Sequence, residues 1–150
     1  IDVGIIKSGF IGDNATTVAA GDIPLETKRL LAATEQSLFE AISHARAGRK
    51  LADLCGAVEE FVTPRGFTVV REFVGHGVGR RLHEEPQVPN YRPQGKSPTL
   101  LPGMTLAHAS PKAAEIAVKS SAAGSPEPRL VLAIFCRICA TGSIITDSSG

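Results

Sequence analysis

The sequence predicts an α/β protein, more closely an α+β protein, in which an antiparallel sheet is covered by two helices. Residues 1–20 alternate apolar and polar side chains in the manner of a hairpin. Residues 25–47 and 51–62 have the apolar periodicity of helices, and residues 67–73 and 103–107 are short strand-like runs. Each helix has one apolar face that needs a partner, and a sheet is the natural one.

The composition limits the classes of partner. The 150 residues are enough for one domain with its own core, or for a large part of a bigger domain. The net charge of +1 gives no electrostatic reason to expect nucleic acid or a membrane surface as a partner, and no apolar run approaches the roughly 20 residues that span a bilayer. The three cysteines, an odd number, argue against a disulfide framework and fit a reducing compartment, so we expect a cytoplasmic protein.

The predicted hairpin places two acidic residues together. A two-residue turn at residues 8–9 sets Gly4 opposite Asp13. Directly opposed residues share a face, so Asp2 and Asp13 become diagonal neighbours about 5 to 8 Å apart. Two carboxylates this close repel each other unless a cation lies between them, and a divalent metal ion is the natural candidate. The alternative is two solvated aspartates, and a register slip of one residue would place them on opposite faces.

Two amphipathic helices follow the hairpin. In residues 25–47 the apolar positions form one stripe, made of Leu31, Leu38, Ile42 and Ala45. In residues 51–62 the stripe is made of Leu51, Leu54, Cys55, Val58, Phe61 and Val62. Gly48 and Pro64 follow as the expected terminators. We interpret both helices as scaffold and Cys55 as part of the buried core.

The stretch from residue 75 to residue 89 contains the residues best suited to chemistry. His76 lies between two glycines, which leave backbone room for an approaching ion or substrate. His83 follows, with a carboxylate pair and a proline directly after it. Histidine is the commonest protein metal ligand and the usual proton carrier near neutral pH. The alternative for so short a motif is a glycine-rich turn with a surface histidine.

Taken together, these stretches resemble the type I methionine aminopeptidases. The matching runs are DV and GFIGD at residues 2–3 and 9–13, VVREFVGHGVGR at 69–80, HEEPQV at 83–88 and PGMT at 102–105. The resemblance implies a pita-bread-like fold, which we expect to be incomplete and to lack its N-terminal part. We expect residues 1–106 to form the methionine aminopeptidase-like region and residues 107–150 to form a divergent tail that completes the sheet.

The resemblance also implies a dinuclear metal site. In that family the aspartate at Asp2 chelates one metal ion, the aspartate at Asp13 bridges both, and the histidine at His76 binds the other. The histidine at His83 contacts the substrate and helps to stabilise the transition state. The chemistry agrees, because two metal ions that share a water lower its pKa and polarise the scissile carbonyl. His83 can donate a hydrogen bond to the developing oxyanion.

Two family ligands are missing from this sequence. The glutamate positions of the family fall on Ala109 and Ala140, and methyl groups cannot bind a metal ion. We therefore expect one weak site for a divalent metal (Co, Mn, Fe or Zn) rather than two, and weak or absent removal of N-terminal methionine from peptides. The alternative is a non-catalytic pita-bread-like remnant with a binding or structural role. Apolar surface exposed by an incomplete fold would also favour a homo-oligomer.

Overall fold

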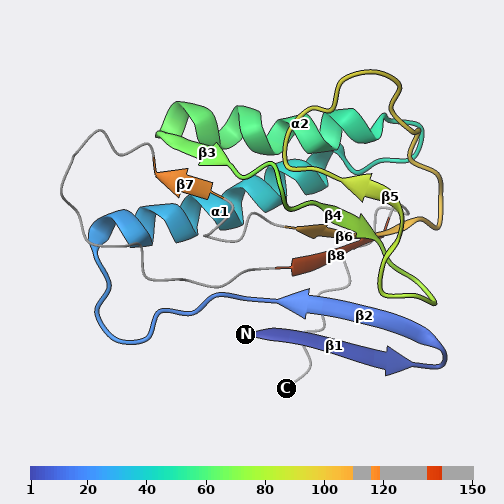
Figure 1. The fold of residues 1–150 in the computed structure, drawn as a ribbon, viewed down its shortest axis with the longest axis horizontal. Coiled ribbons are helices and arrows are strands. Elements are labelled where there is room, and N and C mark those ends of the chain that lie inside the picture. Colours follow the sequence, from blue (N-terminus) through green and yellow to red (C-terminus); the bar gives the residue numbers. More distant parts are fainter. Residues whose placement is uncertain (110–115, 119–134, 140–150) are drawn as a thin grey trace.

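The computed structural model describes residues 1–109, 116–118 and 135–139 (Figure 1). The elements in chain order are β1 (Asp2–Lys7), β2 (Phe10–Ala15), α1 (Leu25–His44), α2 (Leu51–Val62), the short 3-10 helix η1 (Thr63–Arg65), β3 (Phe67–Val69), β4 (Gly75–Gly77), β5 (Glu84–Val88), β6 (Thr105–Ala109), β7 (Ile116–Val118) and β8 (Phe135–Cys139). None of the helices in this described part is long and apolar enough to cross a membrane.

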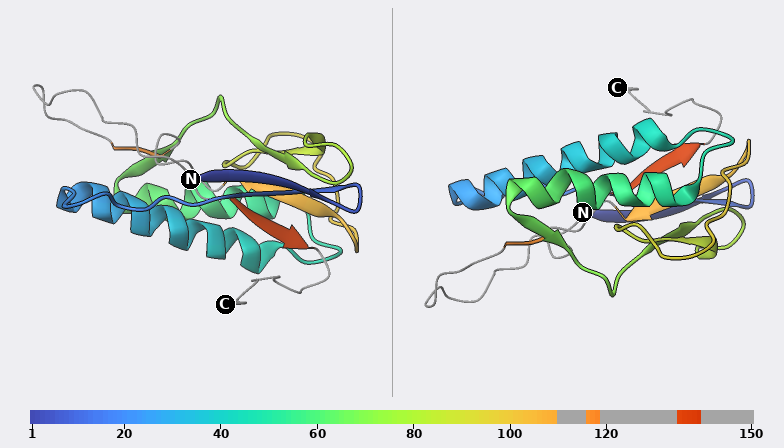
Figure 2. Two further views of the ribbon diagram at one scale, coloured as in Figure 1. Left: turned by 90° about the horizontal axis from the view of Figure 1, so that it is seen from below. Right: turned by 90° about the horizontal axis from the view of Figure 1, so that it is seen from above.

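The strands form one large antiparallel sheet and one small one. The large sheet has the order β1-β2-β8-β6-β4-β5, and β3 pairs with β7 in a separate two-stranded sheet. The helices α1 and α2 run side by side along the sheet (Figures 1 and 2). The predicted class, an antiparallel sheet covered by two helices, is confirmed.

The hairpin has the register that the sequence predicts. Ser8 and Gly9 form its turn with φ angles of 53° and 77°, as a two-residue hairpin turn with positive φ at both positions requires. Gly4 is paired with Asp13, and Asp2 with Ala15. The return strand β2 ends at Ala15 and not near residue 20, although Ile1 and Thr16 still exchange two backbone hydrogen bonds of 2.8 and 2.9 Å just beyond it.

The helix α2 has the predicted bounds and buries the predicted stripe, with Phe61 half-buried. The helix α1 ends at His44, before Gly48, and of the predicted stripe Leu38 and Ala45 are buried. Leu31 and Ile42 are only half-buried. The buried positions are Leu30, Ala33, Thr34, Ser37, Leu38 and Ala41. The small residues among them let α1 approach α2 closely, so the face was set by size as well as by hydrophobicity.

The main core joins the helices to the sheet. Its buried members come from α1 and the residue after it, from α2, β5, β6 and the loop before β6, and they are Ala41, Ala45, Leu51, Leu54, Cys55, Val58, Val88, Leu100 and Leu106. A second cluster, made of Leu30, Ala33, Val62 and Phe67, packs the far ends of the helices onto β3. These contacts fix β4, β5 and β6 on the helices and so give the site described next a rigid base.

Candidate metal centre

The structure brings His76 and Asp13 together. Atom Nε2 of His76 lies 3.8 Å from Oδ2 of Asp13, and each side chain is only 12% exposed. On its other side, Nδ1 of His76 lies 2.9 Å from the carbonyl oxygen of Gly77. This contact suits an imidazole protonated at Nδ1, whose Nε2 then keeps a free electron pair beside the Asp13 carboxylate. An imidazole nitrogen and a carboxylate oxygen are ligands that Mn, Fe, Co and Zn accept.

His83 lies directly against His76. The two ring centroids are 4.2 Å apart and the ring planes are inclined by 55°. The pairing of β4 with β5 explains this contact, because its register shifts after His76 and sets Gly77 opposite Glu84. The shift brings His83, the residue before Glu84, back alongside β4. His76 is therefore in contact with both Asp13 and His83.

The position of Asp2 relative to Asp13 follows from the strand pairing alone. Its strand position puts it on the same face of the hairpin as Asp13, two residues along from Gly4, and it is exposed. Within the described residues, no three His, Cys, Asp or Glu side chains are gathered closely enough to hold a metal ion. Asp13 and His76 thus form the nucleus of a site, and the role of Asp2 as a third ligand stays a prediction.

Two alanines are predicted to stand at the family's glutamate positions. Ala109 is the last residue of β6 and is paired with Phe135 of β8. Ala140 lies outside the described residues. The strand β8, which comes from the predicted tail, lies between β2 and β6 in the sheet. The boundary that we predict at residue 106 and the loss of two ligands both stay predictions.

Backbone contacts that the sequence pattern does not reveal hold the site together. The amide of Ile11 donates to the carbonyl of Gly79 at 2.7 Å, and the amide of Val78 donates to the carbonyl of Thr105 at 3.0 Å. A Cβ atom at Gly77 would collide with the carbonyl oxygen of Glu85. The only signal in the sequence was the row of glycines around His76, which marked close backbone approach without saying to what.

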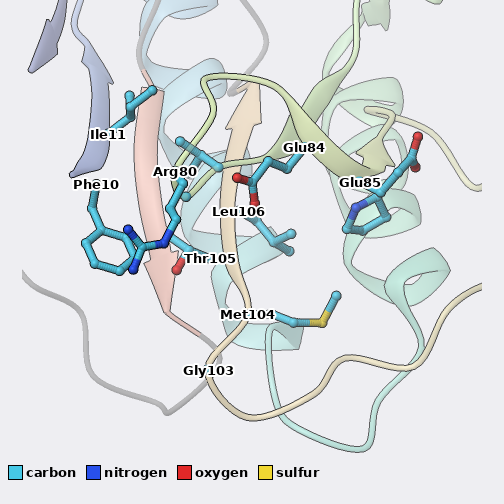
Figure 3. A pocket seen from close by; sticks show the side chains of 12 residues that line it. Phe10, Ile11, Arg80, Glu84, Glu85, Gly103, Met104, Thr105 and Leu106 are labelled. Atoms are coloured by element: carbon cyan, nitrogen blue, oxygen red, sulfur yellow. The ribbon is translucent and has the colours of Figure 1, made fainter. Parts of the chain in front are cut away.

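A cavity of about 430 Å³ opens beside this region, at the turn end of the hairpin (Figure 3). Its lining includes Phe10, Arg80, Glu84 and Met104. The guanidinium carbon of Arg80 lies 4.7 Å from the centre of the Phe10 ring. Asp13, His76 and His83 are not among the lining residues, so the cavity adjoins the candidate centre without containing it.

Cys55 is fully buried on α2, as the sequence predicts. Burial away from water raises the pKa of its thiol to about 12. A thiol that stays protonated at neutral pH is a poor nucleophile. Cys55 therefore belongs to the core and not to a catalytic site.

Comparisons with known proteins agree with this geometry. The family model of metallopeptidase family M24 matches residues 1–120. Methionine aminopeptidase 1 of Bacillus subtilis is 46% identical over 107 residues, which are 71% of this chain and 43% of the relative. Methionine aminopeptidase of Escherichia coli K12 is 42% identical over 106 residues, 71% of this chain and 40% of the relative. The chain therefore spans less than half the length of these curated relatives.

Solved structures show the same fold. The crystal structure of methionine aminopeptidase from Thermotoga maritima aligns with a TM-score of 0.72 at 35% identity, over 95% of this chain and 54% of that chain. The prolidase of Pyrococcus furiosus aligns with a TM-score of 0.71 at 19% identity, over 92% of this chain and 36% of that chain, a likeness of fold alone. The predicted pita-bread-like fold and the resemblance to methionine aminopeptidases are confirmed.

Proposed function

Because the chain belongs to metallopeptidase family M24, we propose that it is a methionine aminopeptidase-like metallopeptidase that removes N-terminal methionine from peptides, with weak activity. The observation that supports this most directly is the contact of Asp13 with His76 beside the ring of His83. Two kinds of metal ligand and a hydrogen-bond donor are thereby gathered at one point, which is what metal-assisted hydrolysis of a peptide bond needs.

Each residue has a defined task in this proposal. Asp13 and His76 would hold a divalent cation, and Asp2 would complete the set from the same face of the hairpin. A bound cation supplies a Lewis acid for the scissile carbonyl and an activated water. His83 holds a proton on its ring and donates a hydrogen bond to the carbonyl oxygen as negative charge develops there. The ring of His76 supports His83 at a centroid distance of 4.2 Å.

The activity should be weak because the ligand set is small. The family's remaining carboxylates fall on Ala109 and Ala140, so fewer negative charges are present to hold two dications. Loss of a supporting partner alone typically costs roughly 10- to 100-fold in metal affinity or activity, and loss of a direct ligand should cost more. We therefore propose one weak site for Co, Mn, Fe or Zn.

The same placement supports a second proposal, a non-catalytic pita-bread-like domain with a binding or structural role. It is favoured by the absence of a three-ligand group among the described residues. The apolar side chains exposed on the hairpin would then suit contact with a second copy of the chain, and they are Ile1, Val3, Ile5, Ile6 and Phe10. In either proposal the chain is cytoplasmic and has no nucleic acid or membrane partner.

Titration of the 150-residue chain with Mn²⁺, followed by calorimetry, separates these proposals. The first proposal expects one weak site and slow release of methionine from a Met-Ala-Ser peptide, detected by mass spectrometry. Two tight sites with rapid hydrolysis would contradict the weak single site. Neither binding nor hydrolysis, with a melting temperature unchanged by EDTA, would leave the non-catalytic domain as the function.

A further inference from the structure

The residues between β4 and β5, residues 78–83, form a turn that ends at His83, directly before Glu84 at the start of β5. One side chain closes this turn. Atom Oε1 of Glu84 accepts a hydrogen bond from the amide of Arg81 at 2.9 Å. The amide of Gly79 donates to the carbonyl of Arg81 at 3.2 Å, so the turn is linked internally at both of its ends.

We propose that Glu84 is a positioning residue for His83, a role that rests on the proposed function where it concerns catalysis. The carboxylate of Glu84 fixes the path of the backbone that ends in His83. The imidazole of His83 is thereby kept against the ring of His76, 4.2 Å away between centroids. Glu84 itself touches neither a metal ligand nor, in this proposal, the substrate.

The space around the carboxylate supports this role. A Cβ atom built on Gly79 would lie only 2.8 Å from Oε2 of Glu84 and 3.2 Å from its Cδ. The carboxylate therefore packs flat against the backbone of Gly79, where no other residue type would let it approach so closely. Figure 3 shows the Glu84 carboxylate turned toward the loop of Arg80, whereas the carboxylate of Glu85 points away from it.

The same turn is connected to the strands on both sides. The carbonyl of Gly79 accepts a hydrogen bond from Ile11, two residues before Asp13 in β2. Val78 is hydrogen-bonded to Thr105 at the start of β6. A change in the turn would consequently be felt by Asp13 and by His83, which lie on different elements. One hydrogen-bond acceptor in the turn can thus set the mutual placement of the candidate catalytic groups.

Two conservative variants separate the geometry of Glu84 from its charge. Glu84→Asp keeps the charge but is one methylene shorter, so its carboxylate no longer reaches the amide of Arg81. Glu84→Gln loses the charge but keeps an oxygen acceptor at the same distance. Glu85→Asp is the matched control, because it shortens the neighbouring carboxylate that is turned away from the loop.

The first readout is the nuclear Overhauser effect between the ring protons of His76 and His83 in the 150-residue chain. We expect it in the unchanged chain, in Glu84→Gln and in Glu85→Asp, and we expect its loss in Glu84→Asp while the amide signals of α2 stay in place. Retention of the effect in Glu84→Asp, or its loss in Glu84→Gln, would overturn the proposal. This readout needs neither a metal ion nor activity.

The second readout is steady-state hydrolysis of Met-Ala-Ser with Mn²⁺. We expect kcat of Glu84→Asp to fall by roughly 10-fold, the lower end of the effect of supporting residues, with little change in KM. A change confined to KM would contradict a positioning role for His83. If the unchanged chain shows no turnover, the proposed function fails, and the ring contact still decides the role of Glu84.

Discussion

His76 and Asp13 meet although their strands are not neighbours, for β8 and β6 lie between β2 and β4 in the sheet. The 3.8 Å contact therefore depends on the turn end of the hairpin, where Ile11 is hydrogen-bonded to Gly79. A contact built in this way is sensitive to a change in either hydrogen-bonded segment. The contact between the two side chains also explains why both are largely shielded from water.

The first prediction concerns this pair. Asp13→Asn keeps the size of the side chain but removes the charge that attracts a cation, so the affinity for Mn²⁺ should fall by about 10-fold or more. Calorimetric titration measures it. Asp22→Asn is the control, because Asp22 is an exposed aspartate in the loop before α1. Equal Mn²⁺ affinities of Asp13→Asn and the unchanged chain would show that Asp13 is not a ligand.

The second prediction compares two glycines of the sheet. Gly77→Ala should destabilise the chain by roughly 2 kcal/mol or more, since the new methyl group collides with the backbone carbonyl of Glu85, which cannot move easily. Gly4→Ala meets nothing within 4 Å and should change the free energy of unfolding by less than about 0.5 kcal/mol. Urea unfolding of both variants gives the values. Similar values for the two variants would contradict the packing at Gly77.

Features set by local sequence were the ones that sequence reasoning could reach. The hairpin register follows from its two-residue turn, and α2 follows from its apolar spacing and from Pro64. On α1 the burial of Leu38 was predicted, but the burial of the small residues Ala33 and Ser37 was not. Their burial reflects the close approach of α2, which apolar periodicity does not record.

The candidate site likewise has a part that the sequence suggests and a part that it does not. The residue types and their order suggested Asp13, His76 and His83, and the structure places them together. No sequence pattern indicated the hydrogen bond from the amide of Arg81 to the carboxylate of Glu84, or the packing of that carboxylate on Gly79. They depend on a register shift between β4 and β5 that arises only when the strands pair.

The third prediction concerns acid. A hydrogen bond from Arg92, 3.0 Å away, holds the pKa of Asp53 below its ordinary value. A depressed pKa in the folded state stabilises the fold above the pKa of the unfolded chain, and this stabilisation is lost as the pH falls through the folded-state pKa. Unfolding free energies of the unchanged chain and of Asp53→Asn should therefore differ at pH 7 and converge near pH 2.

Comparing the unfolding free energies of the unchanged chain and of Asp53→Asn across pH separates the contribution of Asp53 from those of the other carboxylates. Glu60 also interacts with Arg92, at 3.3 Å, so Asp53→Asn leaves part of the attachment of residue 92 to α2 in place. A difference between the two proteins that stays constant from pH 7 to pH 2 would mean that the Asp53 pKa is the same in the folded and unfolded chains.

The last prediction concerns alkali. The pKa of the Cys55 thiol rises from 9.0 to about 12 because the fully buried group is kept from water. Between these values the unfolded chain ionises at Cys55 and the folded chain does not, so the folded state loses stability as the pH rises, by about 1.4 kcal/mol per pH unit. Cys55→Val removes this titration while keeping an apolar side chain in the core.

Urea unfolding at pH 8 and pH 10.5 tests the alkaline effect in both proteins. The unchanged chain should lose roughly 1 to 2 kcal/mol more than Cys55→Val between the two conditions. All other side chains are the same in both proteins, so their contributions cancel in the difference. Any loss of stability caused by packing valine at position 55 is present at both pH values and cancels as well. Equal losses would mean that water reaches the thiol in the folded state and that α2 packs less tightly against the sheet than the structure shows.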